Sequence, residues 1–335
     1  MELLSTKEIE KLNSDERKRY FNNFREASLK MHVSNLHIDP NIIELVGPKL
    51  RNFEFIIEGE ENIPKNVPVV FGSNHSNSHD IFIGYEVLAK LGIRGSIMVA
   101  KDCLNPFTIN LFRIAGSTLL DRRIKKSRQH SMMEMTKRMY NKQAGWIFVE
   151  GTWNLFPGKV NQEPHVGIIN IASATDGVMI PVSMLYKERA GIITKEEDLY
   201  IDCKVRFGKP IVPDPNKTPL QNIAAFKEAF DELRKEHLKE NKMYYESIDQ
   251  VPVMEYLDHT IIKMFKALGF KFRQTHEAQF LQGTAKTIPN VHVMGPNGKL
   301  RAEFLPDMDL NRLKDINAKD FTEKDRKLIL DLERR

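Results

Sequence analysis

The chain of 335 residues is poor in cysteine, with Cys103 and Cys203 as its only two. Two cysteines cannot build the disulfide framework on which small secreted domains depend, so a reducing cytosol is the natural setting. No stretch approaches the roughly 18 consecutive apolar residues that a transmembrane helix needs. The first residues lack a basic segment followed by an apolar run, so we expect no signal peptide. These absences predict a cytoplasmic protein without a membrane span.

The chain also lacks a strong charge of either sign. Its 50 Lys and Arg residues against 45 Asp and Glu residues give a net charge of only +5. This balance does not predict nucleic-acid binding, although it permits attraction to anionic lipid or phosphate. A 41% apolar fraction with 28% charged residues is typical of globular proteins. The length allows one large domain or two modest ones.

Short apolar runs alternate with helical patterns through the middle of the chain. We expect seven strands, at Phe53–Ile57, Val67–Gly72, Ser96–Ala100, Ser117–Leu120, Gly145–Val149, Val178–Met184 and Leu199–Phe207. The helical patterns between them cover Asp80–Leu91, Pro106–Ala115, Ser127–Lys142 and His165–Thr175. Strands that alternate with helices of about ten residues or more predict an α/β fold. We therefore expect a mixed, largely parallel sheet of about seven strands with helices on both faces.

The two ends of the chain have different patterns. We expect an N-terminal helical segment at residues 1–50 and the α/β domain at residues 51–215. A mostly helical C-terminal extension is expected at residues 216–335. In this extension we expect a helix at Pro219–Glu240, an amphipathic helix at Met254–Phe272, a hairpin at Val291–Phe304 and a charged helix from Lys319.

A polar stretch after the second expected strand contains His75 and Asp80, in the pattern His-x4-Asp. A histidine at the end of a strand, with a carboxylate one helical turn later, forms a base and the group that orients it. Such a pair can activate a hydroxyl as a nucleophile without a metal or cofactor. Alone, the pattern is a weak signal, because a capped helix start with solvated histidines would look the same.

Other polar groups follow other expected strands. Asp121-Arg122-Arg123 offers guanidinium groups, which suit bidentate binding of phosphate or carboxylate. In Glu150-Gly151-Thr152, the glycine lets backbone N–H groups approach a ligand closely. Pro181 lies in an apolar strand and indicates an edge or a bulge. Each of these segments alone is equally typical of an ordinary strand-to-loop turn.

Taken together, in this order and at these separations, the segments resemble the glycerolipid acyltransferase family, the 1-acylglycerol-3-phosphate acyltransferases and their relatives. Its four blocks correspond to His75 with Asp80, Gly116 through Arg122, Phe148 through Thr152, and Ile180-Pro181. The resemblance covers about residues 50–215. It implies a glycerol-3-phosphate acyltransferase-like fold. It also implies a reaction that needs no metal and no cofactor. The donor would be a fatty acyl thioester, either acyl-CoA or acyl carrier protein, and the acceptor a lysophosphatidic acid-type glycerolipid.

The resemblance also implies roles for individual residues. His75 would take the proton from the acceptor hydroxyl as it attacks the thioester, and Asp80 would hold the imidazole and stabilise the imidazolium. Arg122 and the loop of Glu150, Gly151 and Thr152 would hold the phosphate of the acceptor, with Lys101 as a weaker candidate.

The chain departs from the family in the third block. Trp153 and Asn154 stand where the family normally has arginine and serine, and Val149 where it usually has proline. The missing arginine removes a bidentate phosphate ligand. Two alternatives remain open. Either Arg123, Lys125 or Lys159 compensates, or the acceptor has a different head group on which Trp153 packs.

Two further readings compete with acyl transfer. His75 and His79, followed by Asp80, superficially resemble a metal-binding pair, but the His-Glu-x-x-His pattern and a third ligand are missing. The chain could also be a lipid-surface binding protein that has lost turnover.

Lipid substrates imply contact with a membrane. We expect peripheral association with its inner face through the basic run Arg122–Arg128, or through the apolar stripe of Met254–Phe272.

Overall fold

The structure, a computed structural model, describes most of the first 244 residues and three short strands beyond them. The described ranges are 4–33, 53–75, 80–101, 106–122, 124–151, 163–188, 201–244, 271–272, 291–294 and 300–303.

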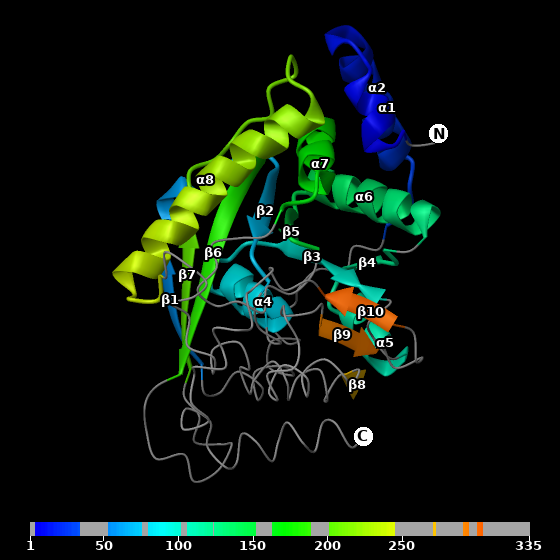
Figure 1. Ribbon diagram of the computed structural model, residues 1–335. Coiled ribbons are helices and arrows are strands. Elements are labelled where there is room, and N and C mark those ends of the chain that lie inside the picture. Colours follow the sequence, from blue (N-terminus) through cyan, green and yellow to red (C-terminus); the bar gives the residue numbers. More distant parts are fainter. Residues whose placement is uncertain are drawn as a thin grey trace, which may run out of the picture.

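A seven-stranded sheet forms the centre of the described part, with the strand order β1-β7-β6-β2-β5-β3-β4 (Figure 1). Its strands are β1 (Phe53–Glu58), β2 (Val69–Ser73), β3 (Gly95–Ala100), β4 (Thr118–Leu120), β5 (Ala144–Phe148), β6 (Val178–Glu188) and β7 (Ile201–Phe207). Neighbouring strands pair in parallel, except that β6 and β7 pair antiparallel. The predicted mixed, largely parallel sheet is therefore confirmed, and each expected strand is present.

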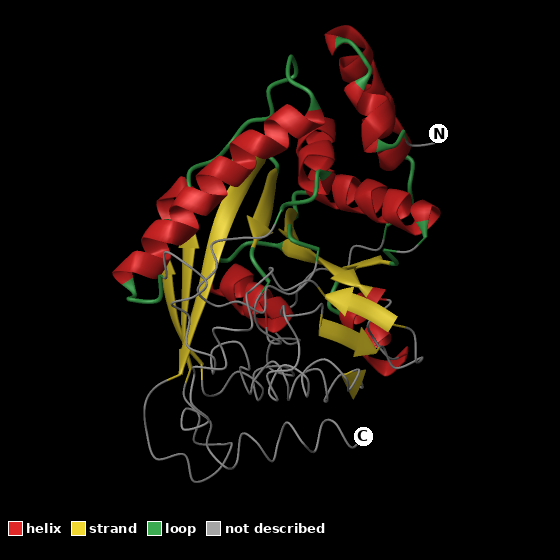
Figure 2. Ribbon diagram, viewed as in Figure 1, coloured by secondary structure: helices red, strands yellow, loops and turns green. Residues whose placement is uncertain are grey.

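Helices cover both faces of this sheet, as expected (Figure 2). They are α4 (Asp80–Lys90), α5 (Pro106–Ile114), α6 (Lys125–Tyr140), α7 (Gly167–Thr175) and α8 (Pro219–Glu240). Successive strand residues point to opposite faces. Phe71 and Trp146 accordingly pack with Ile83 and Leu88 of α4 in one core cluster. Their neighbours Val70 and Ile147 pack in a second cluster, which contains side chains of α6, α7 and α8.

The helix α8 is part of this second core. Its Phe226 and Phe230 are fully buried there, and it lies along β6 (Figure 1). The sequence places α8 beyond the boundary at residue 215, so the α/β core extends past the segment with the acyltransferase-like blocks.

Two N-terminal helices, α1 (Thr6–Glu10) and α2 (Ser14–Leu29), occupy the described part of residues 1–50. Both begin with a capping box, in which Ser5 and Asn13 satisfy the first backbone N–H groups. The helix α2 packs on α6 and α7, and Arg25 Nε donates a hydrogen bond to the Ala174 carbonyl over 2.7 Å.

Three short strands lie further along the chain: β8 (Lys271–Phe272), β9 (Val291–Met294) and β10 (Leu300–Glu303). Antiparallel pairing of β9 with β10 is the pairing that the expected hairpin requires. Lys271–Phe272 pair with β9, where the sequence predicts the end of a helix, so that helix prediction is wrong at its last two residues. The rest of that helix, the turn of the hairpin and the tail from Lys319 lie outside the described residues.

Within the described ranges, no helix combines the length and the apolar character that a membrane crossing requires.

Candidate active site

His75 and Asp80 lie together at the carboxyl end of β2. His75 follows the last residue of β2 by two positions, and Asp80 is the first residue of α4. The imidazole Nδ1 and the carboxylate Oδ2 are 2.7 Å apart, a short hydrogen bond. The Asp80 side chain is fully buried, whereas 15% of the His75 side chain is exposed. The structure thus brings together the two residues that the sequence predicts as base and orienting group.

A second hydrogen bond fixes the carboxylate of Asp80. The Tyr186 hydroxyl, from β6, donates to Oδ1, so both carboxylate oxygens are bonded. Burial and the negative charge of Asp80 raise the pKa of Tyr186 well above its ordinary value. The phenol therefore stays protonated and remains a donor. Because Asp80 accepts from Nδ1–H of His75, Nε2 is the nitrogen without a proton in the neutral ring.

The ring and backbone of His75 are also held in place. Its imidazole stacks on Phe148 of β5, with ring centroids 4.4 Å apart and planes inclined by 25°. The preceding residue, Asn74, is fully buried and bonds the backbone of Met184 at two atoms. Its Nδ2 donates to the carbonyl over 3.1 Å, and its Oδ1 accepts from the N–H over 2.8 Å. These contacts hold Asn74 and His75 against β6 and β5, the two strands that flank β2.

The second candidate segment forms a tight turn after β5. Glu150 is buried, and Gly151 has a positive φ of 64°. A Cβ at Gly151 would lie 2.5 Å from the ring of His165, so both the backbone angle and the space require glycine. Arg122, at the end of β4, donates from Nη1 to the Gly151 carbonyl. The structure therefore joins two blocks that the sequence groups together.

His165 belongs to this turn as well, and sequence reasoning missed it. Its backbone N–H donates to the Val149 carbonyl over 2.8 Å. Partial burial and the positive charge of Arg122 lower the pKa of its imidazole, although the residue keeps exposed surface. At neutral pH a neutral imidazole therefore lies beside the Arg122 guanidinium.

These groups share one edge of the sheet. His75, Lys101, Arg122 and Glu150 follow the carboxyl ends of β2, β3, β4 and β5, which run parallel to one another. Ligands of open α/β sheets bind outside the carboxyl ends of the strands. In the described part of the chain, no hydrogen bond or ion pair joins Lys101 to the other predicted residues. Thr152, Trp153 and His79 lie outside the described residues.

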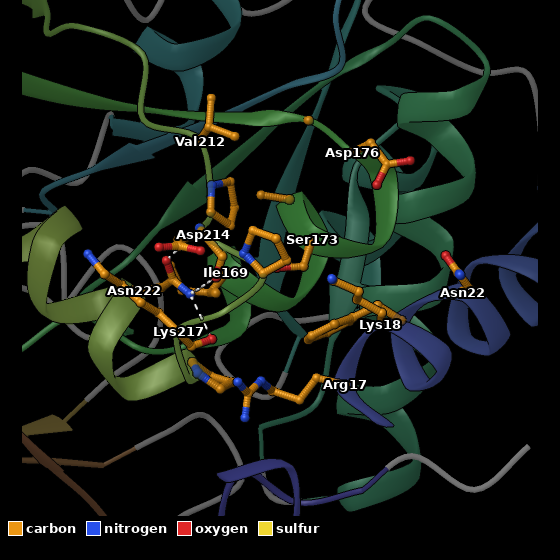
Figure 3. A pocket seen from close by; sticks show the side chains of 16 residues that line it. Arg17, Lys18, Asn22, Ile169, Ser173, Asp176, Val212, Asp214, Lys217 and Asn222 are labelled. Atoms are coloured by element: carbon orange, nitrogen blue, oxygen red, sulfur yellow. Dashed lines mark hydrogen bonds between the residues drawn. The ribbon is translucent and has the colours of Figure 1, made fainter. Parts of the chain in front are cut away.

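A separate pocket of about 450 Å³ lies away from this edge, between α2, α7 and the segment before α8 (Figure 3). Arg17 and Lys18 enter it from α2, opposite Asp214 and Asn222. Arg17 donates to the carbonyls of Leu12 and Asn216, and Asp214 accepts from the Asn216 N–H. The bond from Arg17 to Asn216 holds α2 to the segment before α8. The pocket therefore lies at the boundary between these two elements.

Among the residues that the structure describes, no group of three or more His, Cys, Asp or Glu side chains could hold a metal ion.

Comparisons with known proteins find a match to acyltransferases. The family model described as Acyltransferase matches residues 54–185, which include His75, Asp80, Arg122 and Glu150. No curated protein matches the sequence.

One solved structure that aligns with this chain is the 1-acyl-sn-glycerophosphate (LPA) acyltransferase PlsC from Thermotoga maritima, at 17% identity and a TM-score of 0.42. The alignment covers 70% of this chain and 85% of that one.

Proposed function

We propose that the chain, whose residues 54–185 match the family model described as Acyltransferase, transfers a fatty acyl group from a thioester to a glycerolipid hydroxyl. The observation that supports the proposal most directly is the arrangement of His75, Asp80 and Tyr186. One carboxylate oxygen bonds the imidazole and the other accepts from the phenol. This is the geometry of a general base with a fixed orienting group.

The proposed reaction is a direct transfer. The acceptor hydroxyl gives its proton to Nε2 of His75 while its oxygen attacks the thioester carbonyl carbon. The tetrahedral intermediate then collapses, the C–S bond breaks, and the imidazolium returns the proton to the leaving thiolate. The products are an ester and a free thiol, and no acyl-enzyme forms. Asp80 stabilises the imidazolium while it exists. A positioned base of this kind contributes about 10²–10⁴-fold.

We propose a lysophosphatidic acid-type acceptor whose phosphate is bound by Arg122 and by the segment Glu150-Gly151-Thr152. A guanidinium has five N–H donors in a planar fork, and the bond to Gly151 uses one of them. That bond also holds the fork beside the edge where His75 lies. Lys101 is the second candidate ligand.

We further propose that the chain works at the inner face of a membrane, with the start of α6 as its contact. Ile124, Lys125, Lys126 and Arg128 are exposed there. The first turn of α6 has no acidic residue, and its N-cap makes no side-chain hydrogen bond. Cations at a helix N-terminus oppose the helix dipole and cost about 0.3–1 kcal/mol each. A contact with anionic lipid would offset that cost.

The reaction is tested by thiol release from acyl-CoA or acyl carrier protein, with a panel of single-chain acceptors. Lysophosphatidic acid and a monoacylglycerol of the same chain length differ only in the phosphate. We expect release with lysophosphatidic acid and little with the monoacylglycerol. Equal release with both would mean a different head-group preference. No release with any acceptor or donor would favour a lipid-surface binding protein and overturn the proposal.

Arg122→Met tests the phosphate contact. We expect the KM for lysophosphatidic acid to rise about ten-fold or more, because a charge-assisted bidentate contact is lost. Arg113→Met, which removes an exposed arginine at the end of α5, serves as the matched control. If Arg122→Met lowers activity equally on a non-phosphate acceptor, Arg122 only supports the turn.

The membrane contact is tested by sedimentation with vesicles that contain phosphatidic acid or only neutral lipid. We expect binding to the anionic vesicles that weakens as salt rises. Replacing Lys125, Lys126 and Arg128 together by glutamine should remove it. Binding that is indifferent to both salt and these substitutions would contradict an electrostatic contact.

A further inference from the structure

We propose that Asn74 is a positioning residue that holds the base His75 in its place relative to Asp80. It does so together with Tyr186, because both Asn74 and Asp80 are bonded to one short stretch of β6. The inference rests on the proposed function and adds to it a residue that acts through the base. Asn74 directly precedes His75 in the sequence, so a displacement of one displaces the other.

The side chain of Asn74 continues the sheet after β2 has ended. The last residue pair between β2 and β6 joins Ser73 to Val182. One residue later, both ends of the Asn74 amide bond the backbone of Met184, since Nδ2 donates to the carbonyl and Oδ1 accepts from the N–H. The amide thus supplies the two hydrogen bonds that a further peptide group of β2 would supply. His75 is therefore tied to β6 although the strand before it has ended.

A second bond reaches β6 two residues further along the strand. The Tyr186 hydroxyl donates to Oδ1 of Asp80, whose Oδ2 bonds Nδ1 of His75. The base is thus held through Met184, and its carboxylate partner is held through Tyr186. Residues two positions apart in a strand have a fixed separation of about 6–7 Å. The strand β6 therefore fixes where His75 and Asp80 lie relative to each other.

The backbone of Met184 is itself firmly held. Met184 is fully buried, and its carbonyl also accepts a hydrogen bond from Nη1 of Arg234 over 3.0 Å. Asn74 is fully buried as well, so water cannot replace its bonds. Removing the Asn74 amide would leave the Met184 N–H without its partner, which is costly in the interior of a protein. The position of Met184 is therefore well defined, and the amide places the next residue, His75, relative to it.

A second buried asparagine has the same bonding pattern away from the active-site edge. Oδ1 of Asn222, on α8, accepts from the Asp214 N–H over 2.9 Å, and Nδ2 donates to the carbonyl of the same residue over 3.0 Å. Asn222 is 6% exposed and lines the separate pocket between α2 and the segment before α8. Substitution of Asn222 therefore measures what the loss of such an amide costs the fold alone.

The first test compares Asn74→Leu with Asn222→Leu in turnover and thermal stability. Both variants lose a buried two-point hydrogen bond and should lower Tm by about 2–12 °C. Only Asn74→Leu should lower kcat, by about 10²-fold, the size expected when reacting groups shift by about 1 Å. Its KM values should change by less than about three-fold, because Asn74 acts on the base and not on substrate binding. A kcat no lower than that of Asn222→Leu, or a loss confined to KM, would overturn the inference.

A milder pair of variants serves if Asn74→Leu does not fold. Asn74→Ser and Asn222→Ser each leave a smaller polar side chain in place of the amide. The same difference in kcat between the two positions is expected, at a smaller size. Equal kcat values for folded Asn74→Ser and Asn222→Ser would show that Asn74 is merely structural, and the inference would be wrong.

The second test asks whether Asn74 and Tyr186 act together. Tyr186→Phe removes the bond that joins Asp80 to β6. Once either residue is replaced, β6 no longer sets the separation of base and carboxylate, so replacing the other should cost little more. The kcat of the double variant should therefore be about ten-fold higher than the two separate losses, multiplied together, would give. Losses that multiply without this difference would overturn the joint action of the two residues.

The third test does not depend on turnover and so separates the two proposals. The Nδ1–H proton of His75 is followed by NMR in protein with isotope-labelled histidine, and is assigned by its absence in His75→Ala. Asn74→Leu should shift or broaden this signal, because the bond to Asp80 changes, whereas Asn222→Leu should leave it unchanged. An unchanged signal in Asn74→Leu would overturn the inference in an active enzyme too. A wild type that releases no thiol with any acceptor would instead overturn the proposed function, and the NMR signal would still decide the inference.

Discussion

Two histidines, His75 after β2 and His237 on α8, show how strongly the surroundings of a residue determine its chemistry. His75 bonds a carboxylate, stacks on Phe148 and keeps 15% of its side chain exposed. His237, on α8, is fully buried and bonds the Ser183 hydroxyl through Nδ1 over 2.9 Å. Its Nε2 has no hydrogen-bond partner within the described ranges.

The electrostatic environments of the two rings are opposite in sign. Burial, with the positive charges of Arg206, Arg234 and Lys204, lowers the pKa of His237 to about 3. That imidazole stays neutral at any ordinary pH and cannot exchange protons usefully. His75 instead has the negatively charged carboxylate of Asp80 as its hydrogen-bond partner. The comparison teaches that the partner atom and exposure, more than the residue type, separate a candidate base from a core histidine.

The strongest test of the comparison is His75→Ala. We expect kcat to fall by about 10⁴-fold, the upper end of what a general base contributes, with the fold retained. The measurement is thiol release, with circular dichroism and Tm as folding checks. His237→Ala is the matched control and should lower Tm without a comparable loss of turnover. Substantial residual activity in His75→Ala would break the proposed mechanism.

Asp80→Asn removes the charge that distinguishes the two environments. We expect kcat to fall by about 10³-fold with a much smaller change in KM, because the amide disturbs the tautomer and no longer stabilises the imidazolium. Steady-state kinetics with varied acceptor separates the two parameters. A loss confined to KM would mean that Asp80 serves binding and not the base.

Tyr186→Phe removes the second hydrogen bond to Asp80 and leaves the carboxylate in place. We expect about a ten-fold loss in kcat, because the carboxylate loses one charge-assisted hydrogen bond. Tyr85→Phe is the matched control, because it also removes a buried hydroxyl. In the wild type that hydroxyl bonds Ser117. Equal rates for the two variants would show that the bond from Tyr186 has no part in turnover.

His237→Gln should change turnover by less than about two-fold, yet it should alter the response to acid. The folded protein keeps His237 neutral, while the unfolded chain binds a proton near its ordinary pKa of about 6.5. Stability should therefore fall as pH drops from about 6.5 toward 3, by about 1.4 kcal/mol per pH unit. In the variant, the free energy of unfolding, measured by denaturant titration at several pH values, should lack this part of its dependence on pH. An unchanged slope would mean that His237 is not held neutral.

The strands could be predicted because they are buried in a parallel sheet and appear as apolar runs. The pair of His75 and Asp80 could also be predicted, since the two residues are five positions apart and local geometry joins them. The contact of Tyr186 with Asp80 could not be predicted, because the two residues are 106 positions apart in the sequence. The expected strand ended at Met184, whereas β6 runs to Glu188 and so points Tyr186 to the same face as Met184.

Arg234 and His237 escaped prediction for a different reason. Both lie in a helix rich in charged residues, and charge in a sequence indicates solvent exposure unless the partner is known. Their partners on β6 are 50 and 54 positions away. The segments whose chemistry was most open, Thr152 to Asn154 and Lys159, lie outside the described residues, so the acceptor head group stays a prediction.

The tight turn at Gly151 sets a limit for anyone who wishes to redesign the acceptor preference. Any other residue at that position would meet the His165 ring and adopt a strained backbone, at a cost of about 1–3 kcal/mol. A library that randomises this glycine would mostly yield poorly folded clones. Diversity is better introduced at Lys101 and Arg122, whose side chains lie at the same edge on ordinary backbone.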